Sequence, residues 1–145
     1  MTVCTVGFTK KSARRFFELV AGSGTRRVVD VRLNNVSQLA GFAKRDDLAY
    51  FLKAICNVDY VHLPDLAPTQ EMLDAYKKSG GSWAAYEERF LGLMGDRQVE
   101  LSTPRELIDG GCLLCSEHEP HQCHRRLVAE YLEQHWGPLD IRHLK

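Results

Sequence analysis

The amino-acid sequence predicts a single three-layer α/β/α domain over residues 1–145, with a mainly parallel, Rossmann-like sheet. Short β-favouring runs alternate with segments of helical period along most of the chain. Such alternation is typical of parallel strands joined by right-handed helical crossovers, which cover both faces of the sheet. The length suits one domain, and a hydrophobic content of 44% is enough to build its core.

The first strand and the first helix are predicted within residues 3–22. Residues 3–6 form a short apolar run that favours β-structure, and a turn beginning with Gly7 follows. Apolar side chains then recur at positions i, i+3, i+4 and i+7, as on the buried face of a helix: Ala13, Phe16, Phe17 and Val20. Gly22 is expected to end this helix.

A second strand, a second helix and a third strand follow. Residues 26–32 place three valines around an aspartate and predict a buried strand. Asp46 or Asp47 is expected to cap a helix with four residues on its inner face: Leu48, Phe51, Leu52 and Ile55. Residues 59–63 predict the third strand, which Pro64 ends. This βαβαβ order is the pattern of a parallel sheet.

Two helices are predicted in the middle of the chain, separated by a pair of glycines. The first begins after Thr69 and has an inner face of three residues: Met72, Leu73 and Tyr76. Ser82 is expected to cap the second, whose inner face is largely aromatic: Trp83, Tyr86, Phe90, Leu93 and Met94. We interpret these aromatic residues as part of the core.

The C-terminal third predicts two more helices and two more strands. Thr103 and the glutamate three residues later match a capping box, so a short helix is expected over residues 104–109. Residues 112–115 predict a fourth, buried strand, and residues 140–144 an edge strand. The helix between them ends at Gly137 and has an apolar face of four residues: Leu127, Val128, Tyr131 and Leu132.

Composition excludes several classes of protein. No apolar stretch approaches the roughly 18 residues of a membrane helix, and the N-terminus lacks the basic region of a secretory signal. The net charge is zero, so no overall field attracts nucleic acid or a membrane surface. Five cysteines, an odd number, favour reduced thiols, metal ligands or a reactive cysteine over a disulfide framework. We therefore expect a cytoplasmic protein.

Basic residues gather in the N-terminal third, where residues 1–45 hold nine Lys or Arg against two acidic residues. Six of them would form the surface of a nucleic-acid or protein adaptor: Lys10, Lys11, Arg14, Arg15, Arg26 and Arg27. The ordinary interpretation is a set of solvated positions. Because Arg26 and Arg27 begin a strand, away from the other four, we expect at most weak, non-specific binding of nucleic acid.

Ligands of parallel α/β sheets bind at the carboxyl ends of the strands. In this sequence those ends carry polar and reactive residues. Thr9 and Lys10 follow the first strand, and Arg32 ends the second. His62 lies near the end of the third strand, where we interpret it as a core histidine, and Cys115 ends the fourth. These side chains are expected to share one edge of the sheet.

The densest group of reactive residues lies between the fourth strand and the last helix. Cys123 is expected at the helix N-terminus, where exposed N–H groups and the helix dipole stabilise a thiolate and bind an anion. His124 would raise the thiolate fraction or carry protons, and Arg125 would hold an anion with two donors. The alternative is an ordinary small residue at a helix start, with His124 and Arg125 on the surface.

The same region supports a metal interpretation and a redox interpretation. Six potential zinc ligands lie within thirteen residues: Cys112, Cys115, His118, His121, Cys123 and His124. Cys112 and Cys115 cannot share an ion, because residues three apart on a strand point to opposite faces. A zinc ion would use Cys115, Cys123 and His124 with one of the other two histidines; we expect no bound metal. A Cys115–Cys123 redox pair requires Cα atoms within about 7 Å.

Two acidic residues are candidates for the same site. Asp30 and Arg32 lie two apart on a strand and therefore on one face. They form either a structural ion pair or, with Arg32 opposite Arg125, part of an anion site. Glu117 follows Cys115 by two residues, on its side of the strand, and is the best candidate for acid–base chemistry.

Several segments resemble the family called domain of unknown function 488. The resemblance runs over nearly the whole chain, in residues 5–9, 29–32, 42–44, 60–63, 83–86, 114–117 and 123–125. The spaced Cys-x-Glu and Cys-His-Arg motifs are its most specific part. The family motif matches at seven positions: Asp30, Arg32, Cys115, Glu117, Cys123, His124 and Arg125.

The resemblance implies a compact α/β/α domain of bacterial and archaeal cytoplasm and no agreed reaction. His118 and His121 lie outside the motif, which weakens the zinc interpretation. Phe8 and Thr9 stand where many members carry His-Ser, so no role of that histidine carries over. Residues 33–41 lack the proline-containing loop common elsewhere, which leaves room for a different ligand.

These features predict a protein that binds a nucleotide-like or phosphorylated ligand, an anionic small molecule, at the carboxyl edge of its sheet. The residues expected to bind it are Thr9, Lys10, Asp30, Arg32 and Arg125. If a reaction follows, Cys123 or Cys115 is the nucleophile and His124 or Glu117 the proton carrier. The sequence leaves open whether the protein is an enzyme, and the rivals are an adaptor and a zinc-stabilised loop.

Overall fold

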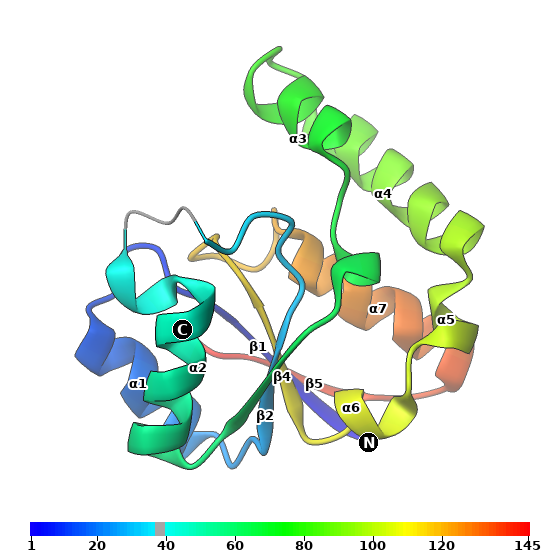
Figure 1. Cartoon of the computed structure of the whole chain (residues 1–145). Helices are drawn as coiled ribbons and strands as arrows, with labels where there is room; N and C mark the ends of the chain where they lie inside the picture. The colour runs from blue at the N-terminus through cyan, green and yellow to red at the C-terminus, as the bar shows by residue number, and fades with distance from the viewer. Residues whose placement is uncertain (37–39) are drawn as a thin grey trace.

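The structure is a computed structural model that describes residues 1–36 and 40–145. Its centre is a five-stranded sheet of parallel strands in the order β3-β2-β4-β1-β5 (Figure 1). The strands are β1 (Thr2–Gly7), β2 (Arg27–Asp30), β3 (Asp59–His62), β4 (Gly111–Cys115) and β5 (Asp140–His143). The predicted α/β fold with a parallel sheet is confirmed.

Helices cover both faces of the sheet. On one face, α1 (Ala13–Gly22) and α2 (Arg45–Phe51) pack against the strands (Figure 1). The other face is covered by α7 (His124–Trp136) and two short helices, α5 (Val99–Ser102) and α6 (Arg105–Ile108). This arrangement gives the three layers that the alternating sequence pattern predicts.

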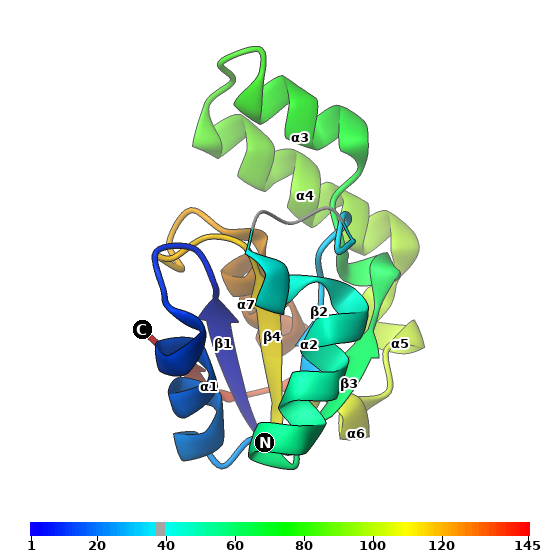
Figure 2. The same ribbon diagram turned by 60° about the vertical axis from the view of Figure 1, so that its left-hand side comes forward.

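A helical hairpin projects beyond the carboxyl ends of the strands, at the top of Figure 2. It consists of α3 (Gln70–Lys77) and α4 (Trp83–Arg97). Ser82 caps α4 as predicted, and Thr69 caps α3, because each side chain accepts a hydrogen bond from an N–H group of the first turn. The hairpin is the element that extends the domain above the sheet edge.

The central strand β4 separates two hydrophobic clusters because its side chains alternate between the faces. Cys112 and Leu114 pack with α1 and α2, whereas Leu113 and Cys115 pack with α7 and the hairpin. All four are buried. The predicted placement of Cys112 and Cys115 on opposite faces is therefore confirmed, and only Cys115 lies on the side of α7.

The structure corrects the prediction for the second helix. A π-helical turn, Leu52–Cys56, follows α2, and its wider i to i+5 spacing rotates Ile55 to the surface, where it is 59% exposed. Asp46 and Asp47 do not cap the helix but lie in its first turn, where carboxylates interact favourably with the helix dipole. Lys44 occupies the N-cap without a side-chain hydrogen bond.

The segment between α4 and β4 also differs from the prediction. The helix α5 was not predicted, and the N–H group of Thr103 donates to Val99 O at its end. Thr103 thus ends one helix instead of beginning the next. Pro104 is the N-cap of α6, so the predicted capping box does not form.

Two further sequence predictions concern membrane helices and the loop after the second strand. Within the described residues, no helix is long and apolar enough to cross a membrane. The polar stretch at residues 33–41 includes positions 37–39, which lie outside the described residues.

Gly7 allows the loop after β4 to pass close to the end of β1. A Cβ atom at this position would lie 1.6 Å from the backbone oxygen of Glu117 and 2.9 Å from Nη1 of Arg125. Thr9 holds the same loop, since its N–H group and its hydroxyl both donate to Ser116 O, at 3.1 and 2.7 Å. The loop is therefore packed against the β1–α1 turn without space for a side chain.

We predict that Gly7→Ala destabilises the protein by at least about 1–3 kcal/mol, the usual cost of overpacking, because the added methyl group displaces the loop. Gly92→Ala is the matched control: this exposed glycine of α4 has no heavy atom near its Cβ position, so the change should stabilise by about 0.5–1 kcal/mol. Urea denaturation measures both. Wild-type stability of Gly7→Ala would contradict the proposed close contact.

Candidate functional site

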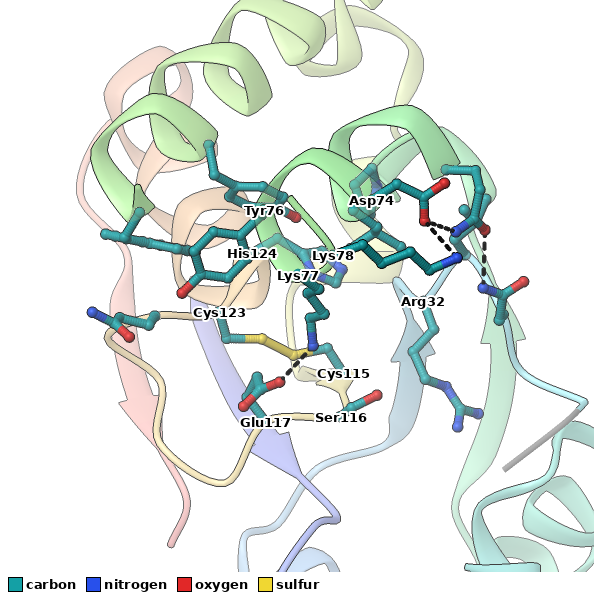
Figure 3. Close-up of a pocket in the computed structure, with 18 residues that line it drawn as sticks. Arg32, Asp74, Tyr76, Lys77, Lys78, Cys115, Ser116, Glu117, Cys123 and His124 are labelled. Atoms are coloured by element: carbon teal, nitrogen blue, oxygen red, sulfur yellow. Dashed lines mark hydrogen bonds and ion pairs between the residues drawn. A yellow bond between two sulfur atoms is a disulfide. The ribbon is translucent and has the colours of Figure 1, made fainter. Parts of the chain in front are cut away.

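A cavity of about 410 Å³ lies at the carboxyl ends of β2 and β4, beneath the end of the α3–α4 hairpin (Figure 3). Its position is the one expected for the ligand site of a parallel sheet. The hairpin contributes aromatic and basic side chains, and the loop between β4 and α7 contributes the floor. The size falls in the usual range for small-molecule sites.

Three aromatic rings form one wall of the cavity. Trp83 and Tyr86 stack with their centroids 5.1 Å apart and their planes 24° from parallel. Tyr76 packs against both, at 5.7 and 5.2 Å. Tyr86 is buried, whereas Tyr76 and Trp83 remain partly exposed. The wall therefore offers aromatic surface to a ligand. The sequence predicted these residues as part of the core, and the structure shows that they also line the cavity.

Two lysines stand at the mouth of the cavity, each beside a carboxylate (Figure 3). Lys77 Nζ lies 3.0 Å from Glu117 Oε1, and Lys78 Nζ lies 3.4 Å from Asp74 Oδ1. All four side chains are substantially exposed. Exposed ion pairs of this kind stabilise a fold by about 0–1 kcal/mol. A ligand anion can therefore take the place of either carboxylate at small cost.

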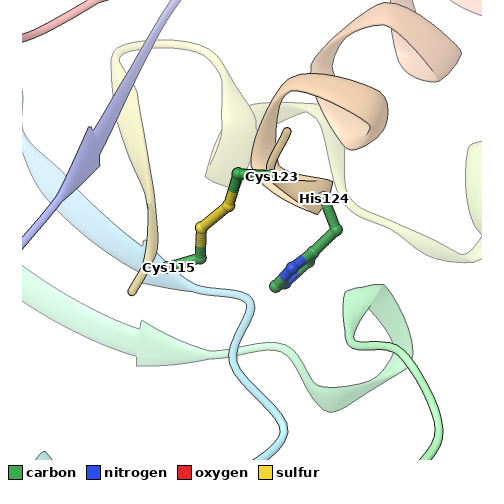
Figure 4. Close-up of side chains that lie close together, drawn as sticks. All are labelled: Cys115, Cys123 and His124. Carbon is green, nitrogen blue, oxygen red and sulfur yellow. A yellow bond between two sulfur atoms is a disulfide. The ribbon is translucent and has the colours of Figure 1, made fainter. Parts of the chain in front are cut away.

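The floor of the cavity contains a disulfide between Cys115, the last residue of β4, and Cys123, the N-cap of α7 (Figure 4). Both cysteines are almost fully buried. Their Cα atoms are 7.4 Å apart, slightly beyond the limit of about 7 Å set for a redox pair. The structure joins the two cysteines that the sequence offered as that pair.

Only three of the four zinc ligands considered in the sequence analysis come together in the structure. The ligand atoms of Cys115, Cys123 and His124 lie within 4.8 Å of one another, the only such group of three Cys, His or acidic residues in the described part of the chain. His118 and His121 do not belong to it. His118 instead places Nδ1 3.1 Å from Nζ of Lys11. The fourth ligand that a structural zinc site needs is thus missing from this group.

His124 links the start of α7 to the end of β2. Its Nε2 lies 2.7 Å from Val31 O, and its ring packs on Phe90. Burial lowers the pKa of His124 to about 4, the bond to Val31 O opposes this shift, and Arg125 adds to it. His124 is therefore neutral near pH 7, so it cannot supply the positive charge that the sequence analysis assigned to it beside Cys123.

Arg125 is fully buried and does not line the cavity. Its Nη1 donates to the backbone oxygen of Glu117 and to Cys115 Sγ, the latter at 3.4 Å. Nη2 and Nε donate to His118 O and to Thr5 Oγ1, both at 3.2 Å. Among the described residues no carboxylate forms an ion pair with it, and burial lowers its pKa to about 10. Arg125 thus organises the loop. The prediction that it binds an anion in the cavity does not fit this position, because its donors point to the loop.

Arg32 and Asp30 form a buried ion pair. Arg32 Nε and Nη2 donate to the two carboxylate oxygens at 2.8 and 2.9 Å, and Nη1 donates to Ala43 O. Burial alone would raise the pKa of Asp30, but Arg32 and the hydroxyl of Tyr60 hold it below its ordinary value. Arg32 lines the cavity yet is only 2% exposed. The structural interpretation of this pair therefore describes it better than an anion site.

The remaining predicted residues divide between the cavity and its surroundings. Glu117 lies at the rim, paired with Lys77. Thr9 and Lys10 do not line the cavity, because the β1–α1 turn is engaged with the other side of the β4–α7 loop. His62 Nε2 lies 2.9 Å from Arg32 O and outside the cavity, which agrees with a core role.

The basic residues of the N-terminal third are split as the sequence predicts. Lys10 and Arg14 lie at the carboxyl end of β1 and the start of α1. Arg26 and Arg27 lie at the amino end of β2, where the guanidinium of Arg27 donates to backbone oxygens of the α6 segment. The two groups therefore lie at opposite ends of the strands.

Sequence reasoning missed the hairpin side of the site. Tyr76, Trp83 and Tyr86 have ordinary helical spacing and look like core, and Lys77 and Lys78 look like a solvated helix end. A signal was available in their order, because aromatic residues flank two lysines and a glycine pair in the segment that links the third and fourth strands. These hairpin residues come near Cys115 and Cys123 only through the tertiary packing of the hairpin, which the sequence pattern does not show.

The fold and the site define a small α/β protein with a cavity at the carboxyl edge of a parallel sheet. The family described as Domain of unknown function DUF488 matches residues 12–132, so the chain belongs to this family. No curated protein and no solved structure matches the chain. The family resemblance read from the sequence is thereby confirmed.

We predict that His124 makes the protein less stable as the pH falls from about 6.5 to about 4. The unfolded histidine takes up a proton near pH 6.5, whereas the folded one does so only near pH 4, so acid favours the unfolded state. Over this range the free energy of unfolding should fall by on the order of 3 kcal/mol through this group.

Urea denaturation of the oxidised protein at several pH values measures this loss. His124→Gln should remove that part of the pH dependence, whereas His121→Gln, at an exposed loop position, should keep it. Equal pH profiles for wild type and His124→Gln would show that His124 is not buried as a neutral group.

Proposed function

We propose that the protein binds a planar, phosphorylated small molecule of the nucleotide class in the cavity at the carboxyl edge of its sheet. One observation carries the proposal: the cavity combines a partly exposed aromatic wall, Tyr76 and Trp83, with two exposed lysine amines at its mouth, Lys77 and Lys78. Aromatic faces and amines together complement a flat ring that carries a phosphate.

The energetics of such a ligand fit the side chains present. Stacking of a base on an aromatic side chain contributes about 1–3 kcal/mol and tolerates different bases. A lysine amine binds phosphate as a point charge, and a hydrogen bond to a charged group contributes about 1.5–3 kcal/mol. The phosphate would replace Glu117 beside Lys77 and Asp74 beside Lys78. The buried Arg32 would stay with Asp30.

We further propose thiol-dependent chemistry at the floor of the cavity. Reduction of the Cys115–Cys123 disulfide by a dithiol adds two electrons and two protons and gives two thiols. Cys115 is then the better nucleophile, because Arg125 Nη1 lies 3.4 Å from its sulfur and favours the thiolate. Neutral His124 would accept a proton instead of supplying charge.

We place this chemistry in the cytoplasm. Cys4, Cys56 and Cys112 are free thiols in the structure. A reducing compartment keeps such thiols reduced and makes the disulfide of the cavity floor reversible.

We predict that ATP quenches the fluorescence of Trp83. The chain has two tryptophans, and Trp136→Phe leaves Trp83 as the only reporter. The combined change Lys77→Met and Lys78→Met should raise the Kd for ATP by about 10–100-fold, because hydrogen bonds to the charged phosphate are lost. It should leave the weak binding of adenosine unchanged, because adenosine has no phosphate. Titrations use oxidised, chelator-treated protein, with inorganic phosphate as a third probe.

Lys53→Met is the matched control for these titrations, because Lys53 also forms an exposed ion pair but lies outside the cavity. It should leave the Kd unchanged. No quenching by any of the three probes, or equal affinity in the double lysine variant, would contradict the proposed ligand class.

We predict that Cys115 is the more acidic thiol of the reduced pair. Cys123→Ser leaves Cys115 alone at the cavity floor, and Cys115→Ser leaves Cys123. The iodoacetamide rate of chelator-treated protein against pH should give a midpoint below about 8.5 for Cys115, and a higher midpoint for Cys123. The reverse order would assign the thiolate to the helix N-terminus instead of Arg125.

A further inference from the structure

The three donor atoms at the cavity floor meet where three fixed backbone positions converge. Cys115 ends β4, Cys123 is the N-cap of α7 and His124 is the first residue of that helix. Their ligand atoms lie within 4.8 Å of one another. Zinc binds sulfur at about 2.3 Å and nitrogen at about 2.0 Å, so donors on a tetrahedron are roughly 3–4 Å apart. The three donors are therefore close enough to reach one ion once the disulfide between the two sulfurs is reduced.

The cysteine backbones leave room for this spacing. The Cα atoms of Cys115 and Cys123 are 7.4 Å apart, wider than the roughly 4.4–6.8 Å usual for a disulfide. Once reduced, the two sulfurs can separate by rotation of the side chains, without movement of β4 or α7. Two thiolates can then bind one ion between the strand end and the helix start.

His124 is prepared as a ligand by its second nitrogen. Val31 O can only accept a hydrogen bond, so Nε2 of His124 carries the proton, and Nδ1 has the lone pair. A histidine that donates its other N–H group to a backbone carbonyl is the usual arrangement around protein metal sites. Figure 4 shows the ring beside the Cys115–Cys123 bond.

Arg125 places a positive charge beside the proposed site. Its guanidinium is fully buried, has no carboxylate partner among the described residues and donates to Cys115 Sγ at 3.4 Å. Zn²⁺ with two thiolates and a neutral histidine carries no net charge, and an added hydroxide or ligand oxygen makes it negative. The buried cation would balance that negative charge.

We propose that the reduced protein binds Zn²⁺ through Cys115, Cys123 and His124, with its fourth coordination position open to the cavity. All three residues line the cavity, and no further Cys, His or acidic residue joins the group within residues 1–36 and 40–145. Three protein ligands and an open position are typical of a catalytic zinc site, whereas a structural site has four. Water or a ligand oxygen would occupy the fourth position.

Reduction of the disulfide and binding of Zn²⁺ balance in atoms and electrons with a dithiol as the only co-reactant. A dithiol reduces the disulfide and becomes a disulfide itself, leaving two cysteine thiols in the protein. Zn²⁺ then displaces one proton from each thiol, and no electron moves in this second step. The site goes beyond the proposed ligand binding, which needs neither reduction nor metal.

Cobalt(II) absorption tests the proposal on the full chain. Anaerobic, reduced, chelator-treated protein is titrated with Co²⁺, which should bind one equivalent with the visible bands of a tetrahedral ion and a thiolate charge-transfer band. Zn²⁺ should displace the cobalt. The oxidised protein should show no such bands, because both sulfurs are occupied, and this comparison requires no variant.

Variants then assign the ligands. Cys123→Ser should weaken both Co²⁺ binding and the thiolate charge-transfer band, because one thiolate is left. His124→Gln removes a direct ligand, so it should weaken Zn²⁺ binding by more than the roughly 10–100-fold that loss of a residue behind the ligands causes. Cys112→Ser, on the opposite face of β4, is the control and should bind as wild type. Circular dichroism of oxidised His124→Gln checks that this variant is folded.

Absence of tetrahedral bands in reduced wild-type protein, or bands unchanged in His124→Gln, would overturn the proposal. Weak bands of an octahedral ion would indicate exposed carboxylates and would overturn it as well. The ATP titration uses oxidised, metal-free protein. Failure of one experiment therefore leaves the other interpretable.

Discussion

A buried guanidinium that forms no ion pair with a carboxylate of residues 1–36 and 40–145 organises the functional edge of the sheet. Arg125 belongs to the first turn of α7, yet it donates to Thr5 of β1, to Cys115 of β4 and to two backbone oxygens of the loop between them. Burying such a charge costs several kcal/mol unless hydrogen bonds replace water. The loop must therefore keep its carbonyls turned inward. The positions of Cys115, Cys123 and the cavity floor depend on this constraint.

The two kinds of basic residue at this edge have different roles because their burial differs. Arg32 and Arg125 are at most 2% exposed, and their donors are engaged by Asp30 and by backbone oxygens. Moving either toward a ligand would break several buried hydrogen bonds. Lys77 and Lys78 are exposed and hold their carboxylates weakly. The arginines therefore shape the site, and the lysines are the groups free to exchange partners.

Local patterns predicted the strands and most helices, and they offered Cys115 and Cys123 as one possible pair. Such patterns identify an element where one of its faces is buried, because the spacing of the apolar residues then distinguishes a helix from a strand. They failed at Ile55, where a π-helical turn changes the period, and at Thr103, where the end of α5 uses the residue assigned to a cap. They also gave Arg125 an outward role, since a sequence does not show which carbonyls a loop turns toward a side chain.

The same two sulfurs form the disulfide and complete the proposed metal site, so oxidation and metal binding exclude each other. A ligand that binds only one of two states shifts the equilibrium toward it by mass action. Zinc would therefore favour the reduced pair, and oxidation would expel the metal and close the open position. Arg125 favours the reduced side as well, because a thiolate at Cys115 would balance its buried charge, whereas a disulfide sulfur carries no charge.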